Sequence, residues 1–297
     1  MFPSSLFISG LLCFGVTADH PTQTDAVPRI EHVVVLGLDG LSNEGLNKAS
    51  TPNLDALKLR GVLLKKSRGV MPSKSAPNWA SILTGVGPER HGIHSNQWWW
   101  LRWRRYLDYP TLFSALRRSG RASTRSAVIH EWNHFGKLWD PVDVDVAHWT
   151  KSASETMEKV DEALSSAPAL MVVHLLGIDR VGHAKGWQSE AYLQAVSRVD
   201  AQVGALLALL EAKSLRQNTL IIIASDHGGI GTKHGGDTPV ERLTPVILNG
   251  PSLREGFVIE TETANVDLFS TIQHVLQLPT LGPAEGRILR EIFVRDP

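Results

Sequence analysis

The residues of this chain best suited to chemistry are aspartates and histidines that stand at the ends of apolar runs. The positions concerned are Asp39, Asp179, His183, Asp226, His227 and His234. Carboxylate oxygens and imidazole nitrogens are ligands that Zn²⁺ accepts, and catalytic zinc sites keep an open coordination position. Together with the hydroxyl of Ser75, this set suits two metal ions and a nucleophile, and it therefore indicates an enzyme.

The spacing of these residues differs in how much it reveals. Asp179 and His183 are four residues apart, so one helical turn or a tight loop brings both onto one metal, although such pairs also occur by chance. The sequence Asp-His-Gly-Gly at 226–229 is a stronger signal, because two ligands directly follow an apolar run and the glycines let the backbone bend. Most of the twelve histidines are expected to be ordinary core or surface residues.

Ser75 is the candidate nucleophile. It precedes Ala-Pro-Asn and an apolar helical segment that Pro77 and Gly85 bracket. A hydroxyl at a helix N-terminus lies near backbone N–H groups that favour an incoming phosphate. The alternative is an ordinary N-cap serine, and we assign Asn78 to such a structural role, holding the turn. The sequence has neither a G-x-S-x-G elbow nor a P-loop.

The elements that must position these side chains alternate between apolar runs and helical patterns. The predicted strands are 32–38, 169–177, 219–225 and 244–250. The predicted helices are 51–61, 77–85, 109–120, 154–167, 189–213 and 266–278. This alternation predicts an α/β fold, a three-layer sandwich with a largely parallel central sheet. Ligands of such folds bind outside the carboxyl ends of the strands, where the candidate residues fall.

The N-terminal segment resembles an export signal. Residues 5–18 are apolar and end in small residues, which predicts a signal peptide at 1–18, a polar linker at 19–29 and a single catalytic domain at 30–297. An uncleaved apolar N-terminus is the alternative, because the first residues carry no Lys or Arg. Cys13 is the only cysteine, so the mature chain would have no thiol. We expect a secreted or periplasmic protein with no transmembrane segment in the mature chain.

Charge restricts the partners. The chain has 30 basic and 30 acidic residues and a formal net charge of zero, which gives no footprint for a nucleic-acid duplex. Small phosphate esters remain suitable substrates, because a metal supplies its own positive charge. The aromatic and basic segment 98–106 either binds a nucleobase or a lipid headgroup, or forms a rim loop packed on the domain. The oligomeric state is not encoded in any pattern of the sequence.

The motifs taken in order resemble a known family. GLDG, S-A-P-N, TG…PERHGI…N, D-x-x-x-H, SDHG and a following HG look like the alkaline phosphatase superfamily, and within it the nucleotide pyrophosphatase/phosphodiesterase family. The resemblance covers nearly the whole mature chain. The ligands that it implies are Asp179, His183 and His234 for one zinc, and Asp39, Ser75, Asp226 and His227 for the other. Asn96 matches the family asparagine that donates to a phosphate oxygen.

The implied activity is two-step phosphoryl transfer through a phosphoserine on Ser75, with two Zn²⁺ ions, for which Mn²⁺ or Fe could substitute. The chain departs from the family pattern twice. It has Ser where these phosphodiesterases usually have Thr, and His234 follows SDHG without the usual long insertion. The compact ending is similar to that of the phosphoethanolamine transferases of the same superfamily, which act on lipid anchors. The physiological substrate is therefore left open between a nucleotide and a lipid headgroup.

Four other functions compete with that of a phosphodiesterase. A phosphomonoesterase needs an extra cation, for which Lys74 and the arginines at 102–105 are candidates. A phosphoethanolamine-type phosphotransferase is the second alternative. A sulfatase is disfavoured because Trp79 stands where its motif has Arg. A non-catalytic binding protein is disfavoured because all seven ligands are present.

Overall fold

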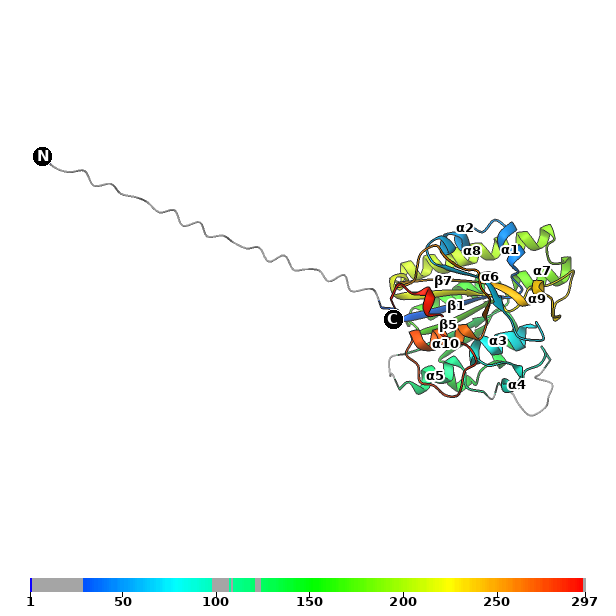
Figure 1. The fold of residues 1–297 in the computed structure, drawn as a ribbon, viewed down its shortest axis with the longest axis horizontal. Coiled ribbons are helices and arrows are strands. Elements are labelled where there is room, and N and C mark those ends of the chain that lie inside the picture. The colour runs from blue at the N-terminus through cyan, green and yellow to red at the C-terminus, as the bar shows by residue number, and fades with distance from the viewer. Residues whose placement is uncertain (2–28, 98–106, 108, 121–123, 296–297) are drawn as a thin grey trace.

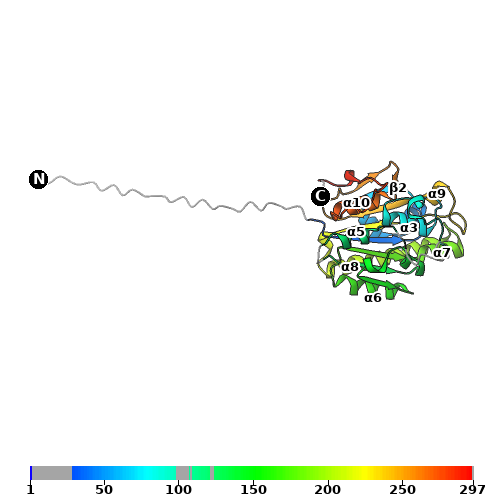
Figure 2. The same cartoon turned by 90° about the horizontal axis from the view of Figure 1, so that it is seen from below.

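The computed structural model describes Met1 and residues 29–97, 107, 109–120 and 124–295. Nearly all of the predicted signal peptide and linker, and the whole segment 98–106, lie outside these residues. The described part contains a central sheet with helices on both faces (Figures 1 and 2). The prediction of an α/β sandwich with a largely parallel sheet is confirmed.

The sheet has nine strands in the described part of the chain, in the order β4-β3-β5-β1-β6-β7-β2-β8, with β9 also paired to β2. The strands are β1 (His32–Leu38), β2 (Val62–Arg68), β3 (Ser126–His130), β4 (Val146–Trp149), β5 (Leu170–Leu175), β6 (Thr219–Ala224), β7 (Leu243–Asn249), β8 (Phe257–Ile259) and β9 (Thr263–Ala264). The central strand β1 lies between β5 and β6, and all three are parallel. Their carboxyl ends therefore meet at one edge of the sheet.

One strand runs against the others. Within the described sheet, β7 pairs antiparallel with both β6 and β2, while every other ladder is parallel. Between β6 and β7 the chain forms only a loop and the four-residue helix α9 (Pro239–Arg242). Antiparallel neighbours need no long crossover, so this connection can be used for chemistry instead. It carries Asp226, His227 and His234.

The helices form two layers, one on each face. The remaining helices are α1 (Asn43–Lys48), α2 (Pro52–Leu59), α3 (Ser75–Thr84), α4 (Pro88–His91), α5 (Leu112–Arg118), α6 (Ala153–Leu164), α7 (Gly177–Lys185), α8 (Glu190–Ala212) and α10 (Asp267–Val275). Buried side chains of α3, α5 and α10 form one core cluster with one face of β1. Those of α1, α2, α6, α7 and α8 form a second cluster with its other face. Alternate residues of β1, such as Val33 and Val34, enter opposite clusters.

The helix predicted to follow Ser75 is present, and it ends before the predicted glycine. α3 begins at Ser75 and ends before Gly85, which adopts a left-handed conformation with φ 73°.

α8 is the one described helix that is long and apolar enough to cross a membrane. Its buried side chains, among them Tyr192 and Val203, pack in the core cluster that also contains β1 and β5.

Candidate functional site

The site begins where two neighbouring strands end. Asp39 follows β1 and Asp226 follows β6, and both carboxylates are almost completely buried. The two strands are in register up to Gly37 and Ala224, two residues before each aspartate. The backbone N–H of Gly40 donates to Asp226 Oδ1 at 3.2 Å. Strand pairing therefore fixes the distance between the two carboxylates before any ligand is considered.

A glycine brings the third carboxylate against the first. Gly40 has φ 76°, and a Cβ at this position would lie 3.0 Å from the Cα of Asp179. The backbone N–H of Asp179 donates to the carbonyl oxygen of Asp39 at 3.1 Å. Because only glycine combines this conformation with so close an approach, the GLDG sequence has a direct structural reason.

Each of the three candidate histidine ligands is held by the backbone through Nδ1. The carbonyl oxygens of Thr232, Gly228 and Ser73 lie 2.9, 2.8 and 2.9 Å from the Nδ1 atoms of His183, His227 and His234 respectively. A carbonyl oxygen only accepts, so Nδ1 is the donor in each case. The lone pair of each ring is consequently on Nε2, the atom that faces the carboxylates.

The first candidate metal cluster consists of Asp179, His183 and His234, whose ligand atoms lie within 4.8 Å of one another. Asp179 Oδ1 is 3.5 Å from His183 Nε2 and 3.7 Å from His234 Nε2. The D-x-x-x-H pair lies on α7, as its spacing predicted. The structure thus brings together the three residues that the motifs assigned to one metal.

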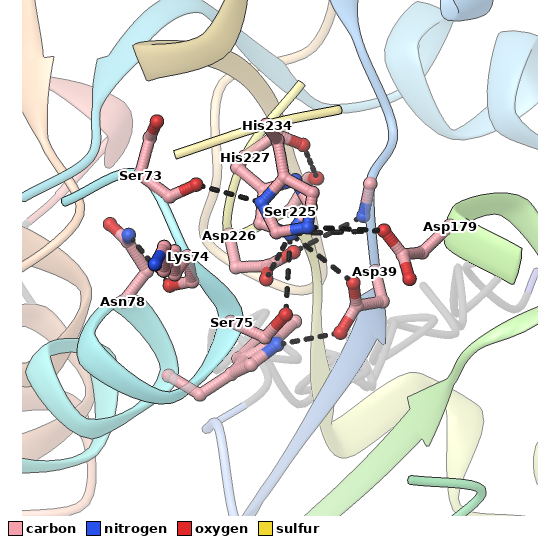
Figure 3. Close-up of polar contacts among 12 residues, drawn as sticks. Asp39, Ser73, Lys74, Ser75, Asn78, Asp179, Ser225, Asp226, His227 and His234 are labelled. Atoms are coloured by element: carbon pink, nitrogen blue, oxygen red, sulfur yellow. Dashed lines mark hydrogen bonds and ion pairs between the residues drawn. The ribbon is translucent and has the colours of Figure 1, made fainter. Parts of the chain in front are cut away.

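The second cluster surrounds His227 Nε2. The oxygens nearest to it are Asp226 Oδ2 at 3.2 Å, Ser75 Oγ at 3.3 Å and Asp39 Oδ1 at 3.5 Å. Figure 3 shows these side chains converging from α3 and from the ends of β1 and β6. Asp179 Oδ1 lies 4.0 Å from the same nitrogen, so Asp179 stands between the two clusters. All seven predicted ligands therefore meet in one place.

The donor set fits divalent metal ions. Asp39 Oδ1, Asp179 Oδ1 and Asp226 Oδ2 are buried and have no hydrogen-bond partner within the described structure. Leaving a buried carboxylate oxygen without a donor is costly, and three such oxygens around imidazole lone pairs need cations. Oxygen and imidazole nitrogen ligands suit zinc and also Mn²⁺ or Fe.

In the metal-free protein the three carboxyl groups differ in their pKa values and therefore in their charge. Burial, with the neighbouring charge of Asp39, raises the pKa of Asp179 to about 8. Burial and the charges of Asp39 and Asp179 also raise the pKa of Asp226 well above its ordinary value. Burial acts in the same direction on Asp39, but the hydrogen bond from His174 and the electrostatic effects of His174, His227 and His234 together outweigh it, so the pKa of Asp39 is lowered. Metal binding must therefore displace protons from Asp179 and Asp226.

Ser75 is the first residue of α3, and its neighbours differ from expectation in one respect. The N–H of Ala76 donates to Asn96 Oδ1 at 2.8 Å, Pro77 has no N–H, and the N–H of Asn78 donates to the carbonyl of Lys74. These backbone donors of the first turn are thus engaged within the protein. The expectation that the helix N-terminus itself offers them to a phosphate is wrong for these residues, and the amide of Asn96 stands beside Ser75 instead.

Asn78 has the structural role that was assigned to it. Its Nδ2 donates to the carbonyls of Val70, Pro72 and Lys74, and its Oδ1 accepts from the N–H of Val70 and from Nδ2 of Asn265. The side chain therefore fastens the loop that precedes Ser75. The same loop supplies the Ser73 carbonyl that orients His234.

Two functional contacts were not predicted from the sequence. Asp39 Oδ2 accepts hydrogen bonds from His174 Nε2 at 2.8 Å and from Trp79 Nε1 at 3.2 Å. His174 lies inside the apolar strand β5, and Trp79 lies on the buried face of α3. A histidine in the middle of a buried strand was the available signal, because a buried imidazole needs a polar partner.

Comparison with known proteins agrees with this geometry. A family profile described as type I phosphodiesterase / nucleotide pyrophosphatase matches residues 33–246. An uncharacterized pyrophosphatase/phosphodiesterase of Schizosaccharomyces pombe is 27% identical over 221 residues, 66% of this chain and 44% of the relative. Ectonucleotide pyrophosphatase/phosphodiesterase family member 3 of Rattus norvegicus is 26% identical over 218 residues, 66% of this chain and 24% of the relative.

Solved structures share the fold. Murine ectonucleotide pyrophosphatase / phosphodiesterase 5, as an inactive variant in complex with AMP, superposes with a TM-score of 0.77 at 17% identity, covering 89% of this chain and 100% of the other. The human protein of the same name gives a TM-score of 0.78 at 16% identity, with coverages of 89% and 100%. The chain spans less than half the length of the curated relatives described above.

Proposed function

Because the chain belongs to the type I phosphodiesterase / nucleotide pyrophosphatase family of the alkaline phosphatase superfamily, we propose that it is a metal-dependent phosphodiesterase. The observation that carries the proposal is the convergence of three unpartnered buried carboxylate oxygens, three imidazole Nε2 atoms and one serine hydroxyl. Structural ion pairs do not leave so many acceptors without donors.

The ligands divide between two zinc ions, and Mn²⁺ or Fe can be accommodated by the same atoms. Asp179, His183 and His234 hold the first ion. Asp39, Ser75, Asp226 and His227 hold the second. When bound, the two ions stabilise negative charge on the attacking and leaving oxygens, as in other two-metal phosphate-ester hydrolases.

Ser75 is the nucleophile. The residue is only 5% exposed, and its Oγ lies 3.3 Å from His227 Nε2. In the first step Ser75 Oγ gives its proton to solvent and forms a bond to phosphorus, while the bond from phosphorus to the leaving oxygen breaks and that oxygen takes a proton from solvent. In the second step water attacks phosphorus and gives a proton to solvent, the bond from phosphorus to Ser75 Oγ breaks, and Ser75 Oγ takes a proton from solvent.

Asn96 binds the phosphate. Its Oδ1 is fixed by the N–H of Ala76, the residue after the nucleophile, so its Nδ2 is held at the same helix end. An amide nitrogen donates hydrogen bonds to a nonbridging phosphate oxygen without adding charge. The side chain is therefore already oriented before substrate binds, and less conformational entropy is lost on binding.

A diester is the preferred substrate class. A monoester dianion needs an additional positive partner, whereas a diester monoanion is matched by the metals and a neutral amide. Lys74 precedes Ser75 and its side chain passes Gly235, where a Cβ would lie 3.0 Å from Lys74 Cε. A phosphomonoesterase is therefore the second candidate, with Lys74 as the extra cation. Murine ectonucleotide pyrophosphatase / phosphodiesterase 5 was solved with AMP, which supports a nucleotide substrate over a lipid headgroup.

Export follows from the apolar N-terminal run and from the relatives named as ectonucleotide enzymes. N-terminal sequencing of the natively produced protein should then begin near Asp19. An intact Met1 in a cytoplasmic fraction contradicts export and leaves the catalytic proposal untouched.

The test of the catalytic proposal is one side-by-side assay of the zinc-loaded protein. The substrates are nitrophenyl phosphate, bis-nitrophenyl phosphate, a nitrophenyl nucleotide diester and nitrophenyl sulfate. We expect the two diesters to be cleaved with the highest kcat/KM, and chelation to abolish the activity. A monoester preference above about tenfold, roughly 1.4 kcal/mol of transition-state binding, favours the phosphomonoesterase. Full activity after exhaustive chelation overturns both.

A further inference from the structure

The two oxygens of Asp39 have opposite environments. Oδ2 accepts two hydrogen bonds, from His174 Nε2 at 2.8 Å and from Trp79 Nε1 at 3.2 Å. Oδ1 has no hydrogen-bond partner among the described residues and lies 3.5 Å from His227 Nε2. Asp226, by comparison, accepts a hydrogen bond on its Oδ1 from the backbone N–H of Gly40. Of the carboxylates at this site, Asp39 is the one held by two side-chain donors.

The two donors come from different elements and are fixed by packing. His174 belongs to β5 and Trp79 to α3, and both are almost completely buried. Their rings meet edge to face with centroids 5.3 Å apart, and Phe135 packs on His174 at 4.5 Å. A Cβ at Gly37 would lie 2.5 Å from the indole, so this glycine makes the space that lets Trp79 reach Asp39.

The imidazole ring of His174 forms its hydrogen bond with Asp39. Its Nδ1 is buried and has no hydrogen-bond partner within the described structure, so the contact of Nε2 with Asp39 is the ring's hydrogen bond there. An apolar side chain would fill the same aromatic surroundings without burying an unpaired nitrogen. This cost makes sense only if the hydrogen bond to Asp39 contributes something that packing does not.

The contribution follows from the geometry of a carboxylate ligand. An oxygen that already accepts two N–H groups has little electron density left for a metal, so binding through both oxygens is suppressed. We propose that His174 and Trp79 are positioning residues that restrict Asp39 to metal binding through Oδ1 alone and set the affinity of the second metal position. The inference rests on the metal site of the proposed function and deepens it.

The test compares His174→Leu and Trp79→Phe with the unaltered protein. Both variants keep an apolar or aromatic side chain and remove one donor to Oδ2. His174→Gln is the conservative variant, because its amide N–H can replace Nε2–H. His130→Leu is the matched control. His130 is also buried and its ring centroid lies 5.9 Å from that of Phe135, but its Nδ1 is hydrogen-bonded to the carbonyl oxygen of Trp132 and not to Asp39.

The readouts do not depend on turnover. Zinc stoichiometry and Kd are measured by competition with a chromophoric chelator, and the visible spectrum of the cobalt-loaded protein reports the coordination number. We expect one of the two metal positions to weaken by about 10- to 100-fold in His174→Leu and Trp79→Phe. We expect His174→Gln to recover most of the affinity, and His130→Leu to resemble the unaltered protein. The cobalt bands should weaken where Asp39 binds through both oxygens.

The outcomes separate this inference from the proposed function. Unaltered protein that binds no zinc overturns the metal site, and with it both statements. Unaltered protein that binds zinc, alongside His174→Leu and Trp79→Phe variants with the same Kd and the same cobalt spectrum, overturns the positioning role only. Circular dichroism of the chelated proteins shows whether each variant folds. If His174→Leu does not fold, the zinc Kd and cobalt spectra of Trp79→Phe and His174→Gln are compared with those of the unaltered protein instead.

Discussion

The imidazole rings of His227 and His234 stack with centroids 3.6 Å apart and planes inclined by 11°. Two protonated rings in this arrangement would repel each other. Burial, reinforced by the neighbouring His234, lowers the pKa of His227 to about 3, and burial also lowers the pKa of His234. Both rings are therefore neutral at neutral pH and present Nε2 lone pairs to the two metal positions that they separate.

The position of Asp179 between the clusters gives the first prediction. Asp179→Asn keeps the size of the side chain but removes the charge that both positions share, so we expect the loss of both metals. His183→Ala should remove the metal of the first cluster only. Metal analysis of the two dialysed variants checks this, and equal metal content in both would contradict an effect of the Asp179 charge on both positions.

Ser75→Ala should keep the fold and the thermal unfolding profile of the unaltered protein. Hydrolysis of a diester should fall by roughly 10⁴-fold or more, because no phosphoserine can form. Ser75→Thr should retain part of the activity, since it restores a hydroxyl. Turnover of the alanine variant near that of the unaltered protein would remove Ser75 from the role of nucleophile.

Asn96 can be tested without disturbing the helix end. Asn96→Asp keeps an acceptor for the N–H of Ala76 but replaces the donating nitrogen with a negatively charged oxygen. We expect kcat to fall by about 10²- to 10³-fold, the cost of losing one oxyanion donor, with zinc content unchanged. Asn96→Ala should lose activity and also some stability, because the Ala76 contact disappears. A fully active Asn96→Asp variant would contradict phosphate binding by this amide.

The raised carboxyl pKa values predict how metal-free protein responds to pH. Burial raises the pKa of Asp179 to about 8 and that of Asp226 well above 3.8. A pKa raised on folding contributes stability that is complete below the unfolded value, near pH 4, and is lost as pH rises through the folded value. The pKa of the buried His227 is lowered to about 3, mainly by burial, so its ring is already neutral above pH 6.5. Between pH 6.5 and 8 the carboxyls therefore dominate.

We expect the Tm of the chelated protein to fall between pH 6.5 and pH 8.5. The Tm of the zinc-loaded protein should fall much less, because the metal takes the place of the proton. Differential scanning calorimetry of both forms at the two pH values makes the measurement. A chelated protein whose Tm does not fall over this interval would show that the two carboxyls are already ionised at pH 6.5.

The convergence of the candidate ligands was predictable, because it depends on their positions at the ends of strands. Parallel strands that end together bring residues such as Asp39 and Asp226 to one edge, whatever the details of packing. His174 and Trp79 could not be assigned in the same way. Their side chains lie within apolar runs, and a contact between a strand interior and a helix face depends on three-dimensional packing, including the space left by Gly37.

Two further features also lay beyond the sequence pattern. A continuous apolar run marks a covered strand but does not encode its direction, so the reversal of β7 was not foreseen. The use of the Ala76 N–H by Asn96 depends on a contact between residues 20 positions apart. Helix start and stop signals in the sequence predicted where α3 begins. Only the assembled fold determines which of its backbone N–H groups remain available to a substrate.

The backbone carbonyls that hold the three histidine rings have a kinetic consequence. Ser73, Gly228 and Thr232 fix the ring orientations through Nδ1 whether or not an ion is present. If a bound metal ion leaves, the three rings keep their orientation, and the next ion binds without a search among rotamers. Exchange should then be limited by ion release and not by reassembly of the ligands, so we expect dialysis of the native protein to be sufficient to exchange one divalent ion for another.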